Sequence, residues 1–335
     1  HLQEAGATPE EELAFALATA IAVLDDLQKK VPAADFPEMV GRISFFVNAG
    51  IRFVTEICKM RAFVQMWDEI CTTRYGITDP KMRRFRYGVQ VNSLGLTEQQ
   101  PENNVPRILL EMLAVTLSKA ARARAVQLPA WNEALGLPRP WDQQWSMRMQ
   151  QILAHETDLL EFGDLFDGNP AIATKTEALK TAARAELNQI EAQGGAMAAI
   201  GYMKSRLVES NAARIAKIES GETTVVGVNK WTQGEDSPLT TGPTAVMTAD
   251  PKAERDQIAA LKDWRIARDN STVEHALQAL RTAAANGDNI MPPSIAAAKT
   301  GATTGEWGEA MRAVFGLYRA PTGISAAPSN QTEGL

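Results

Sequence analysis

The sequence has 335 residues, of which 45% are hydrophobic and 22% charged, and its formal net charge is −6. A chain of this length can bury a substantial core, and its size is ordinary for an α/β barrel or for part of a barrel with an appendage. The negative charge argues against a broad basic surface and so against nucleic acid as the main partner, and no apolar run is long enough to span a membrane.

The predicted elements begin with a capped helix. Thr8 can act as the N-cap, Pro9 suits the first helical position and Glu11 completes a capping box. We therefore predict a helix from Pro9 to about Lys30. Residues 42–50 (RISFFVNAG) are apolar and aromatic-rich, which predicts a buried strand. A long amphipathic helix should follow, and its predicted inner face consists of Phe53, Ile57, Met60, Val64, Trp67 and Cys71.

Strands and helices alternate beyond this point. Further strands are predicted over residues 84–91 and 124–128, and further helices over 103–121, near 132 and over 143–155. Alternating βα units imply parallel strands with right-handed crossovers. Three such units cannot close a barrel, so they fit either the last quarter to half of a (β/α)8 barrel or part of a doubly wound sheet.

The pattern changes after about Asp167. Helices are predicted over residues 174–193, 197–208, 211–219, 252–267, 272–285 and 305–317, with a lone strand over 223–229. The carboxyl-terminal residues are rich in Pro, Ser, Gly and Thr, which is typical of an exposed tether. We therefore divide the chain into residues 1–166, a helical region 167–320 and a flexible tether 321–335.

The sequence carries no familiar metal or nucleotide signature. Its histidines, His1, His155 and His275, are not spaced with Asp, Glu or Cys as a zinc or iron site requires. Cys58 and Cys71 are expected to be reduced core thiols in a cytoplasmic protein. No GxSxG, P-loop or GxGxxG motif occurs, so the chain is an enzyme of another kind or no enzyme.

Candidate functional residues follow the predicted strands, where barrel enzymes place their active sites. His1 and Glu4 precede the capped helix as the end of an earlier strand would, Gln90 belongs to the second predicted strand, and Glu133 follows the third. The cluster KMRRFR, residues 81–86, offers cations to the phosphates of a small molecule.

Each candidate also has a plain structural alternative. His1 can be an accident of where the chain begins, and Arg42 a solvated charge between a helix and a strand. Gln90 can be a satisfied buried amide, and Glu133 a carboxylate favoured by the dipole of a helix N-terminus.

Several segments together resemble the adenosylcobalamin-dependent acyl-CoA mutases, the family of methylmalonyl-CoA mutase. The resemblance is collinear from His1 to about Trp231, and it is carried by HLQEAGATPEEELAFALATA, RISFFVNAGIRFVTEICKMRA, LTEQQPENNVPR, ALGLPRPWDQQWSMRMQQILAHET and VVGVNKW. Within the family, RFRYGVQVNSLGLTEQQPENN, QLPAWNEALGLPRPWDQQW and TTGEWGEAMRAVFGLYRAPTG are most similar to the ethylmalonyl-CoA mutase branch.

The resemblance implies a (β/α)8 TIM barrel with the CoA ester along its axis, followed by a helical linker and a flavodoxin-like cobalamin-binding domain. Residues 1–166 would be the C-terminal part of the CoA-binding catalytic barrel, 167–320 the linker and 321–335 the tether toward the cobalamin domain. The family's cobalt-ligating Asp-x-His-x-x-Gly motif is absent, so the axial histidine is not expected from this chain, which should be inactive alone.

Roles for individual residues also come from the resemblance. It implies that His1 is catalytic and donates a hydrogen bond to the substrate thioester carbonyl. The implied CoA and substrate contacts are Arg42, Ile43, Ser44, Lys81 and Gln90. The implied adenosylcobalamin contacts are Glu4, Ala130 and Glu133, the last on the adenosyl ribose. The methylmalonyl enzymes have a Gly-Trp pair where this chain has Ser93 and Leu94, which puts a strict methylmalonyl specificity in doubt.

The predicted function is therefore a radical carbon-skeleton rearrangement of a branched dicarboxylic acyl-CoA, ethylmalonyl-CoA to methylsuccinyl-CoA. Methylmalonyl-, isobutyryl- and 2-hydroxyisobutyryl-CoA remain alternative substrates, and a helical scaffold or chaperone-docking fragment remains the non-enzymatic alternative. By family, the implied partners are a cobalamin-binding domain, fused or separate, a second copy in a homodimer and a G-protein metallochaperone.

Overall fold

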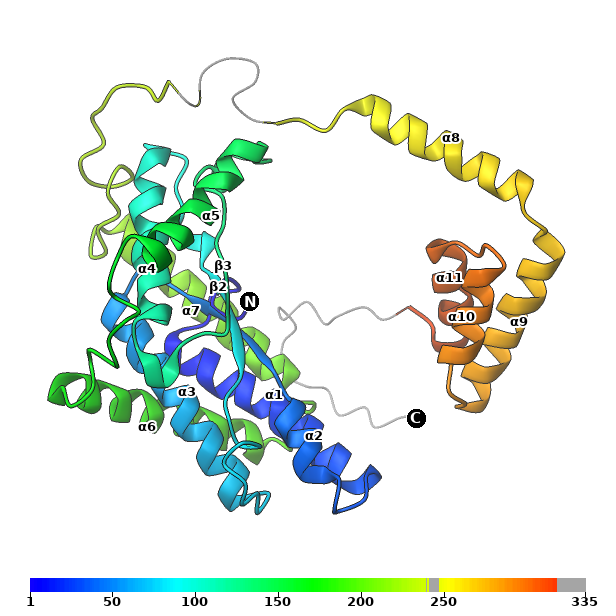
Figure 1. The fold of residues 1–335 in the computed structure, drawn as a ribbon, viewed down its shortest axis with the longest axis horizontal. Helices are drawn as coiled ribbons and strands as arrows, with labels where there is room; N and C mark the ends of the chain where they lie inside the picture. The colour runs from blue at the N-terminus through cyan, green and yellow to red at the C-terminus, as the bar shows by residue number, and fades with distance from the viewer. Residues whose placement is uncertain (239, 241–246, 318–335) are drawn as a thin grey trace. The chain divides into compact units, whose positions relative to one another are not determined.

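A computed structural model describes residues 1–238, 240 and 247–317. The described residues fall into two compact units that divide between Met247 and Thr248. The fold is mixed α/β, with one small sheet among the described residues (Figure 1). The predicted tether, residues 321–335, lies outside the described part of the chain, and the predicted boundary at residues 166 and 167 stays a prediction.

The sheet lies in the first unit and is parallel, as the alternating pattern predicted. Its strands are β1 (Phe45–Ala49), β2 (Tyr87–Val91) and β3 (Ala125–Gln127), in the order β1-β2-β3. In this register Phe45 pairs with Tyr87, and Gln90 pairs with both Asn48 and Gln127. The carboxyl ends of neighbouring strands therefore meet at one edge of the sheet.

Helices pack mainly on one face of this sheet. The helices of the first unit are α1 (Pro9–Lys30), α2 (Phe36–Arg42), α3 (Phe53–Thr73), α4 (Asn104–Thr116), α5 (Pro140–His155), α6 (Pro170–Ala192) and α7 (Ile200–Glu219). Short 3₁₀ helices are η1 (Ser93–Gly95), η2 (Pro101–Asn103), η3 (Lys119–Ala121) and η4 (Glu133–Leu135). The main core joins α1, α3 and one sheet face through Leu17, Trp67, Val47 and Val89.

The predicted start of α1 is confirmed in detail. The Glu11 N–H donates to the Thr8 hydroxyl over 3.3 Å, and the Thr8 N–H donates to the Glu11 carboxylate over 2.9 Å. This capping box satisfies two backbone donors that a helix N-terminus leaves open. It therefore fixes the point at which the turn formed by the first six residues joins the helix.

A buried charge cluster ties α1, β1 and α3 together. The Lys59 ammonium is fully buried and contacts the carboxylates of Glu12 and Glu56 and, over 2.8 Å, the Asn48 carbonyl. The Glu12 carboxylate also accepts from the Asn48 N–H over 2.8 Å. Because a buried charge is costly without partners, this arrangement allows little freedom to the amino end of α1 or to β1.

The second unit is helical. It contains α8 (Pro251–Ala267), α9 (Asn270–Asn286), α10 (Met291–Lys299) and α11 (Thr304–Phe315). Buried residues of α9, α10 and α11 form its core, with Leu277, Leu280, Ala297 and Ala310 among them. The Arg268 guanidinium binds the Glu306 carboxylate and so joins the end of α8 to the start of α11.

Some element predictions were wrong. Residues 223–229 form a loop with an isolated bridge between Val226 and Lys230 rather than a strand. The two helices predicted over 197–219 are one helix, α7. Helices α2 and α10 were not predicted. Arg42 is the last residue of α2, so the first strand starts later than expected.

Candidate active site at the carboxyl ends of the strands

The first six residues form a tight turn ahead of α1. The Ala5 N–H donates to the His1 carbonyl over 3.1 Å, and the Gly6 N–H to the Gln3 carbonyl over 3.0 Å. Gly6 has φ of +110°, and a Cβ there would lie 2.5 Å from the Asn211 Cβ of α7. Glycine is therefore required where α7 packs against this turn.

Glu4 connects the turn to the carboxyl end of β2. Its Oε1 accepts from Gln90 Nε2 over 3.0 Å and from Ser93 Oγ over 3.1 Å. Its Oε2 lies 2.8 Å from His1 Nδ1. The structure thus brings together the predicted residues His1, Glu4 and Gln90, although Gln90 lies 86 positions from Glu4 in the sequence. Ser93 joins them and was noted from the sequence only as a departure from related enzymes.

Glu133 is a second carboxyl group close to Ser93. Partial enclosure by the protein raises the pKa of its carboxyl, and the neighbouring Glu4 carboxylate raises it further. Hydrogen bonds from the Ser93 side chain and the Ala130 backbone partly offset the rise. Two carboxyl groups therefore flank one hydroxyl, an arrangement that can hold a proton or bind hydroxyl groups of a ligand.

Hydrogen bonds to a buried carboxylate fix the segment that carries Ala130 and Glu133. The buried Asp142 carboxylate accepts from Trp131 Nε1 over 3.1 Å and from Asn132 Nδ2 over 2.9 Å. Ala130 is buried, with 1% of its surface exposed. Since Asp142 belongs to α5, this helix sets the direction in which the chain leaves β3.

The remaining predicted residues lie at the opposite end of the sheet. Arg42, Ile43 and Ser44 connect α2 to β1, and Lys81 lies in the turn before β2. The Arg42 guanidinium is exposed, 3.7 Å from the Glu38 carboxylate. The structure therefore separates the predicted residues into two groups, one at each end of the parallel strands. Five-residue strands hold the groups roughly 16 Å apart.

A cavity of about 290 Å³ adjoins the turn. Gln3, Glu56, Asn92, Glu111 and Arg214 are among its lining residues. Burial raises the pKa of the Glu111 carboxyl to about 9, with a smaller contribution from Glu56, so this group is neutral at pH 7. Glu111 was not among the residues predicted from the sequence. The feature that could have identified it is its position as a lone carboxylate within the apolar run ILLEML.

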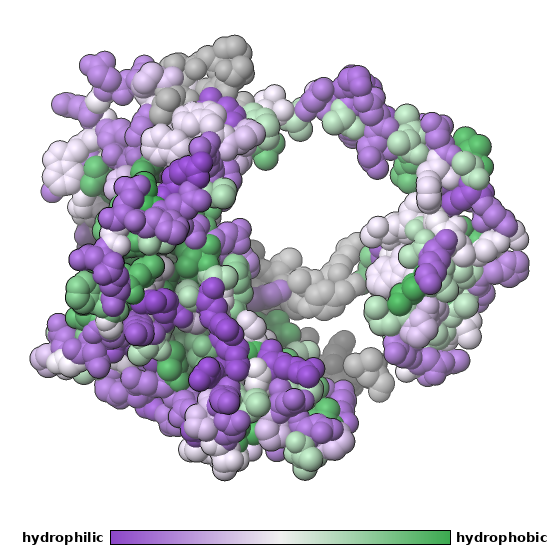
Figure 2. Space-filling view, in the orientation of Figure 1, coloured by the Kyte–Doolittle hydropathy of each residue, from purple (hydrophilic) through white to green (hydrophobic). Residues whose placement is uncertain are grey.

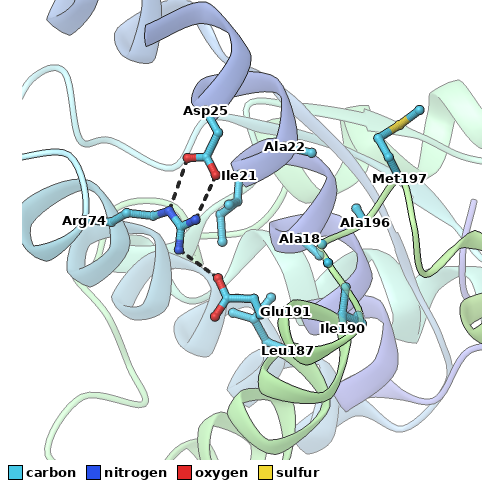
Figure 3. A pocket seen from close by; sticks show the side chains of 12 residues that line it. Ala18, Ile21, Ala22, Asp25, Arg74, Leu187, Ile190, Glu191, Ala196 and Met197 are labelled. Carbon is cyan, nitrogen blue, oxygen red and sulfur yellow. Dashed lines mark hydrogen bonds and ion pairs between the residues drawn. The ribbon is translucent and has the colours of Figure 1, made fainter. Parts of the chain in front are cut away.

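A second cavity, of about 470 Å³, contains none of the predicted site residues. It lies among α1, α3 and α6, with Ile21, Leu187 and Ile190 on its apolar wall (Figure 3). Its cation, Arg74, is paired with the Asp25 and Glu191 carboxylates, each over 2.8 Å. It therefore offers little unbalanced charge to a ligand.

Within the described residues, no group of three or more His, Cys, Asp or Glu side chains could hold a metal ion. Cys58 and Cys71 are free and buried, and burial raises the pKa of the Cys71 thiol to about 12. Within the part of the chain that the structure describes, no helix combines the length and apolar character needed to cross a membrane.

Comparison with known proteins identifies the family to which this chain belongs. The family model described as methylmalonyl-CoA mutase matches residues 1–317. The chain is 75% identical to ethylmalonyl-CoA mutase of Cereibacter sphaeroides over 335 residues, which are 100% of this chain and 51% of that protein. It is 66% identical to ethylmalonyl-CoA mutase of Methylorubrum extorquens over 329 residues, 97% of this chain and 48% of that protein.

Methylmalonyl-CoA mutases are more distant. The enzyme of Cereibacter sphaeroides is 33% identical over 328 residues, 96% of this chain and 44% of that protein. The chain spans about half the length of the curated relatives it matches. The match over nearly its whole length shows that the chain belongs to the methylmalonyl-CoA mutase family.

Proposed function

We propose that this chain is part of an adenosylcobalamin-dependent mutase that rearranges ethylmalonyl-CoA to methylsuccinyl-CoA. The observation that carries the proposal is the difference between two relatives from one organism. The chain is 75% identical to the ethylmalonyl-CoA mutase of Cereibacter sphaeroides but 33% identical to its methylmalonyl-CoA mutase. The two relatives are named for different substrates, and this chain has the higher sequence identity to the ethylmalonyl-CoA enzyme.

The proposed architecture is part of a (β/α)8 barrel. Helices cover one face of the sheet, where Val47 and Val89 are buried, whereas Phe46 on the other face is 46% exposed. Figure 2 shows hydrophobic residues at the surface of the first unit, in the region where Figure 1 draws β2 and β3. Further strands would enclose this face as the interior of a barrel.

His1 lies on that second face, which places it toward the proposed interior. Its ring centroid is 5.3 Å from that of Phe46. At this position the imidazole would donate a hydrogen bond to the thioester carbonyl and hold it in one orientation. Gln90 would contact the acyl part from the neighbouring strand. Both residues act on the substrate from the carboxyl ends of the strands.

The CoA end of the substrate would lie at the amino ends of the strands. Arg42, Ile43, Ser44 and Lys81 would bind it there, with the two cations directed at phosphate. A ligand that contacts both groups must be long and thin, because the groups lie at opposite ends of the sheet. An acyl-CoA has this shape.

The residues around Glu133 fit the cofactor that the family implies. The Glu133 carboxyl has the Ser93 side chain as a neighbour, and the buried Asn132 Oδ1 has no hydrogen-bond partner among the described atoms. Carboxyl and amide oxygens suit a ribose, so Glu4, Ala130 and Glu133 would hold the adenosyl part. Adenosylcobalamin, when bound, supplies the radical chemistry. The protein residues orient the substrate and exclude water.

Partners belong to the same proposal. A cobalamin-binding domain, fused or separate, would provide the histidine that binds cobalt, since the Asp-x-His-x-x-Gly motif does not occur in this sequence. A homodimer and a G-protein metallochaperone follow from the family alone. The 335-residue chain by itself should show no turnover, since it spans about half of its relatives.

A chimeric enzyme tests the function. The matching half of the Cereibacter sphaeroides ethylmalonyl-CoA mutase is replaced by this chain, and the purified protein is assayed with adenosylcobalamin and each of the four acyl-CoA esters. We expect turnover of ethylmalonyl-CoA, and a loss of about 100-fold or more in kcat for His1→Ala. His155→Ala, at the exposed end of α5, is the matched control.

The outcomes separate the alternatives. Preference for methylmalonyl-, isobutyryl- or 2-hydroxyisobutyryl-CoA would reassign the substrate. A folded but inactive chimera would favour the scaffold alternative. An active chimera that is indifferent to His1→Ala would overturn the catalytic role of His1.

A further inference from the structure

The two oxygens of the Glu4 carboxylate have different partners. Oε1 accepts from Gln90 Nε2 over 3.0 Å, from Ser93 Oγ over 3.1 Å and from the Ser93 N–H over 3.4 Å. Oε2 faces His1 Nδ1 at 2.8 Å. Donors from the end of β2 therefore fix one oxygen, and the rigid carboxylate plane then directs the other at the imidazole.

This contact decides which imidazole nitrogen is left for the substrate. A carboxylate accepts hydrogen bonds only, so Nδ1 carries the proton that faces Glu4. Nε2 is then the free nitrogen, and it can donate to a carbonyl only when the ring carries both protons. The orientation of Glu4 thus controls both the direction and the proton of the proposed catalytic donor.

We propose that Ser93 is a positioning residue for His1 and acts through Glu4. The inference rests on the proposed function for its effect on turnover but not for the contact itself. The Ser93 hydroxyl has a single proton, which it donates to Glu4 Oε1 over 3.1 Å, with Glu133 as the alternative acceptor. A glycine supplies no such charge-assisted hydrogen bond, while the longer backbone contact would remain.

The groups that face His1 are few. The titratable ones are Glu4 in the same turn, Glu133 from η4 through its interaction with Glu4, and the α-amino group when His1 begins the chain. Phe46 of β1 and Gln90 of β2 contribute neutral groups. Weakening the Glu4 contact should therefore leave the imidazole ring less firmly oriented, because Glu4 is the described side chain that faces its Nδ1.

The first test separates kcat from KM in the chimera. Ser93→Ala should lower kcat by roughly 10-fold, the equivalent of one charge-assisted hydrogen bond, with KM for the acyl-CoA within about twofold. Ser93→Thr retains the hydroxyl and should restore kcat. Ser210→Ala is the matched control, because it also removes a serine-to-glutamate hydrogen bond, 2.8 Å to Glu11, but from α7.

The second test does not depend on activity. In ¹⁵N-labelled 335-residue chain, the His1 ring nitrogens report whether Nδ1 is protonated and bonded. Ser93→Ala should move the ¹⁵N resonance of His1 Nδ1 toward the position that it has in the Glu4→Gln variant. Ser210→Ala should leave this resonance unchanged. An unchanged Nδ1 signal, or a kcat equal to that of Ser210→Ala in an active chimera, overturns the positioning role. An inactive parent chimera with the expected Nδ1 shift instead counts against the proposed function alone.

Discussion

The Lys59 ammonium lies 2.6 Å from the Glu56 carboxylate, and both side chains are buried. Glu12 of α1 shares the same ammonium, and Gln3 donates to Glu56 over 3.0 Å. Burial lowers the pKa of Lys59, but the two carboxylates more than offset this and raise it. The cluster therefore connects the core of the first unit to the turn that carries the candidate site.

Removing Lys59 should destabilise the protein strongly. Lys59→Met leaves two buried carboxylates without their counter-charge, which we expect to cost about 3–5 kcal/mol of unfolding free energy. Urea denaturation followed by far-ultraviolet circular dichroism measures this. Lys30→Met is the control, because Lys30 pairs with Asp26 over 2.7 Å in an exposed position and should change stability by less than about 1 kcal/mol. Similar losses for both variants would show that the cluster has no special role.

Glu111 should limit stability at neutral and alkaline pH. Burial raises its pKa to about 9 in the folded protein, against 4.5 as the reference value. The folded state then holds a proton that the unfolded state has lost, so the folded protein becomes less stable as pH rises from about 4.5 to about 9. Glu111→Gln keeps the shape without the titration and should stabilise the protein by about 1–3 kcal/mol at pH 8.

The pH dependence provides the check on this prediction. Below about pH 4.5 the variant and the parent should have nearly equal stability, because Glu111 is protonated in both states. Glu98→Gln, on the exposed loop before η2, serves as the control. A constant difference between Glu111→Gln and the parent across the whole range would indicate a packing effect rather than titration.

Local signals in the sequence predicted local structure well. The Thr8 and Glu11 capping box was predicted because all its partners lie within four residues. The strand predicted over 223–229 failed because Asn229 takes its backbone partners. Asn229 Oδ1 accepts from the Val225 N–H, and Nδ2 donates to the Ile218 and Thr223 carbonyls, each over 2.8 Å. Two adjacent valines favour a strand locally, but the Asn229 side chain closes the loop instead.

The sequence likewise predicted only part of the candidate site. Placing Gln90 near the carboxyl end of a parallel strand required only the βα pattern. The contacts of Glu4 with Gln90 and Ser93 join residues 86 and 89 positions apart, and no periodicity reveals such a pair. Likewise, Ser210 does not break α7 because its hydroxyl donates to Glu11 of α1. Contacts between residues distant in the sequence therefore determine these features, and local sequence patterns do not reveal them.

The second unit should lose stability in acid through Glu306. The hydrogen bond from Arg268 is the main cause that holds the pKa of this carboxyl at about 2, although burial opposes it. A lowered folded-state pKa means that the contribution is complete above the reference value of 4.5 and is lost as pH falls toward about 2. Glu306→Gln should therefore reduce amide protection in α11 at pH 6, and the effect should vanish near pH 2.

Hydrogen exchange in the full chain can resolve this effect by helix. Glu309→Gln, on the same helix with an exposed carboxylate 3.3 Å from Arg312, is the matched control and should leave protection of α11 nearly unchanged. Equal loss of protection for both variants would assign the effect to general helix electrostatics and not to the Arg268 contact.

Gly6 should determine whether the His1 turn can form. An alanine there must adopt φ of +110° and would place its Cβ 2.5 Å from Asn211 Cβ and 2.7 Å from the Leu207 carbonyl oxygen. We expect Gly6→Ala to cost about 2–4 kcal/mol of stability and to separate α7 from the turn. Gly195→Ala is the informative control: Gly195 has φ of +88° but open space around it, so it isolates the cost of the backbone angle. If Gly6→Ala loses more stability than Gly195→Ala and also shifts the His1 Nδ1 signal, the packing of α7 on Gly6 holds Glu4 and His1 in place. Equal losses with an unshifted signal would mean that the turn forms independently of α7.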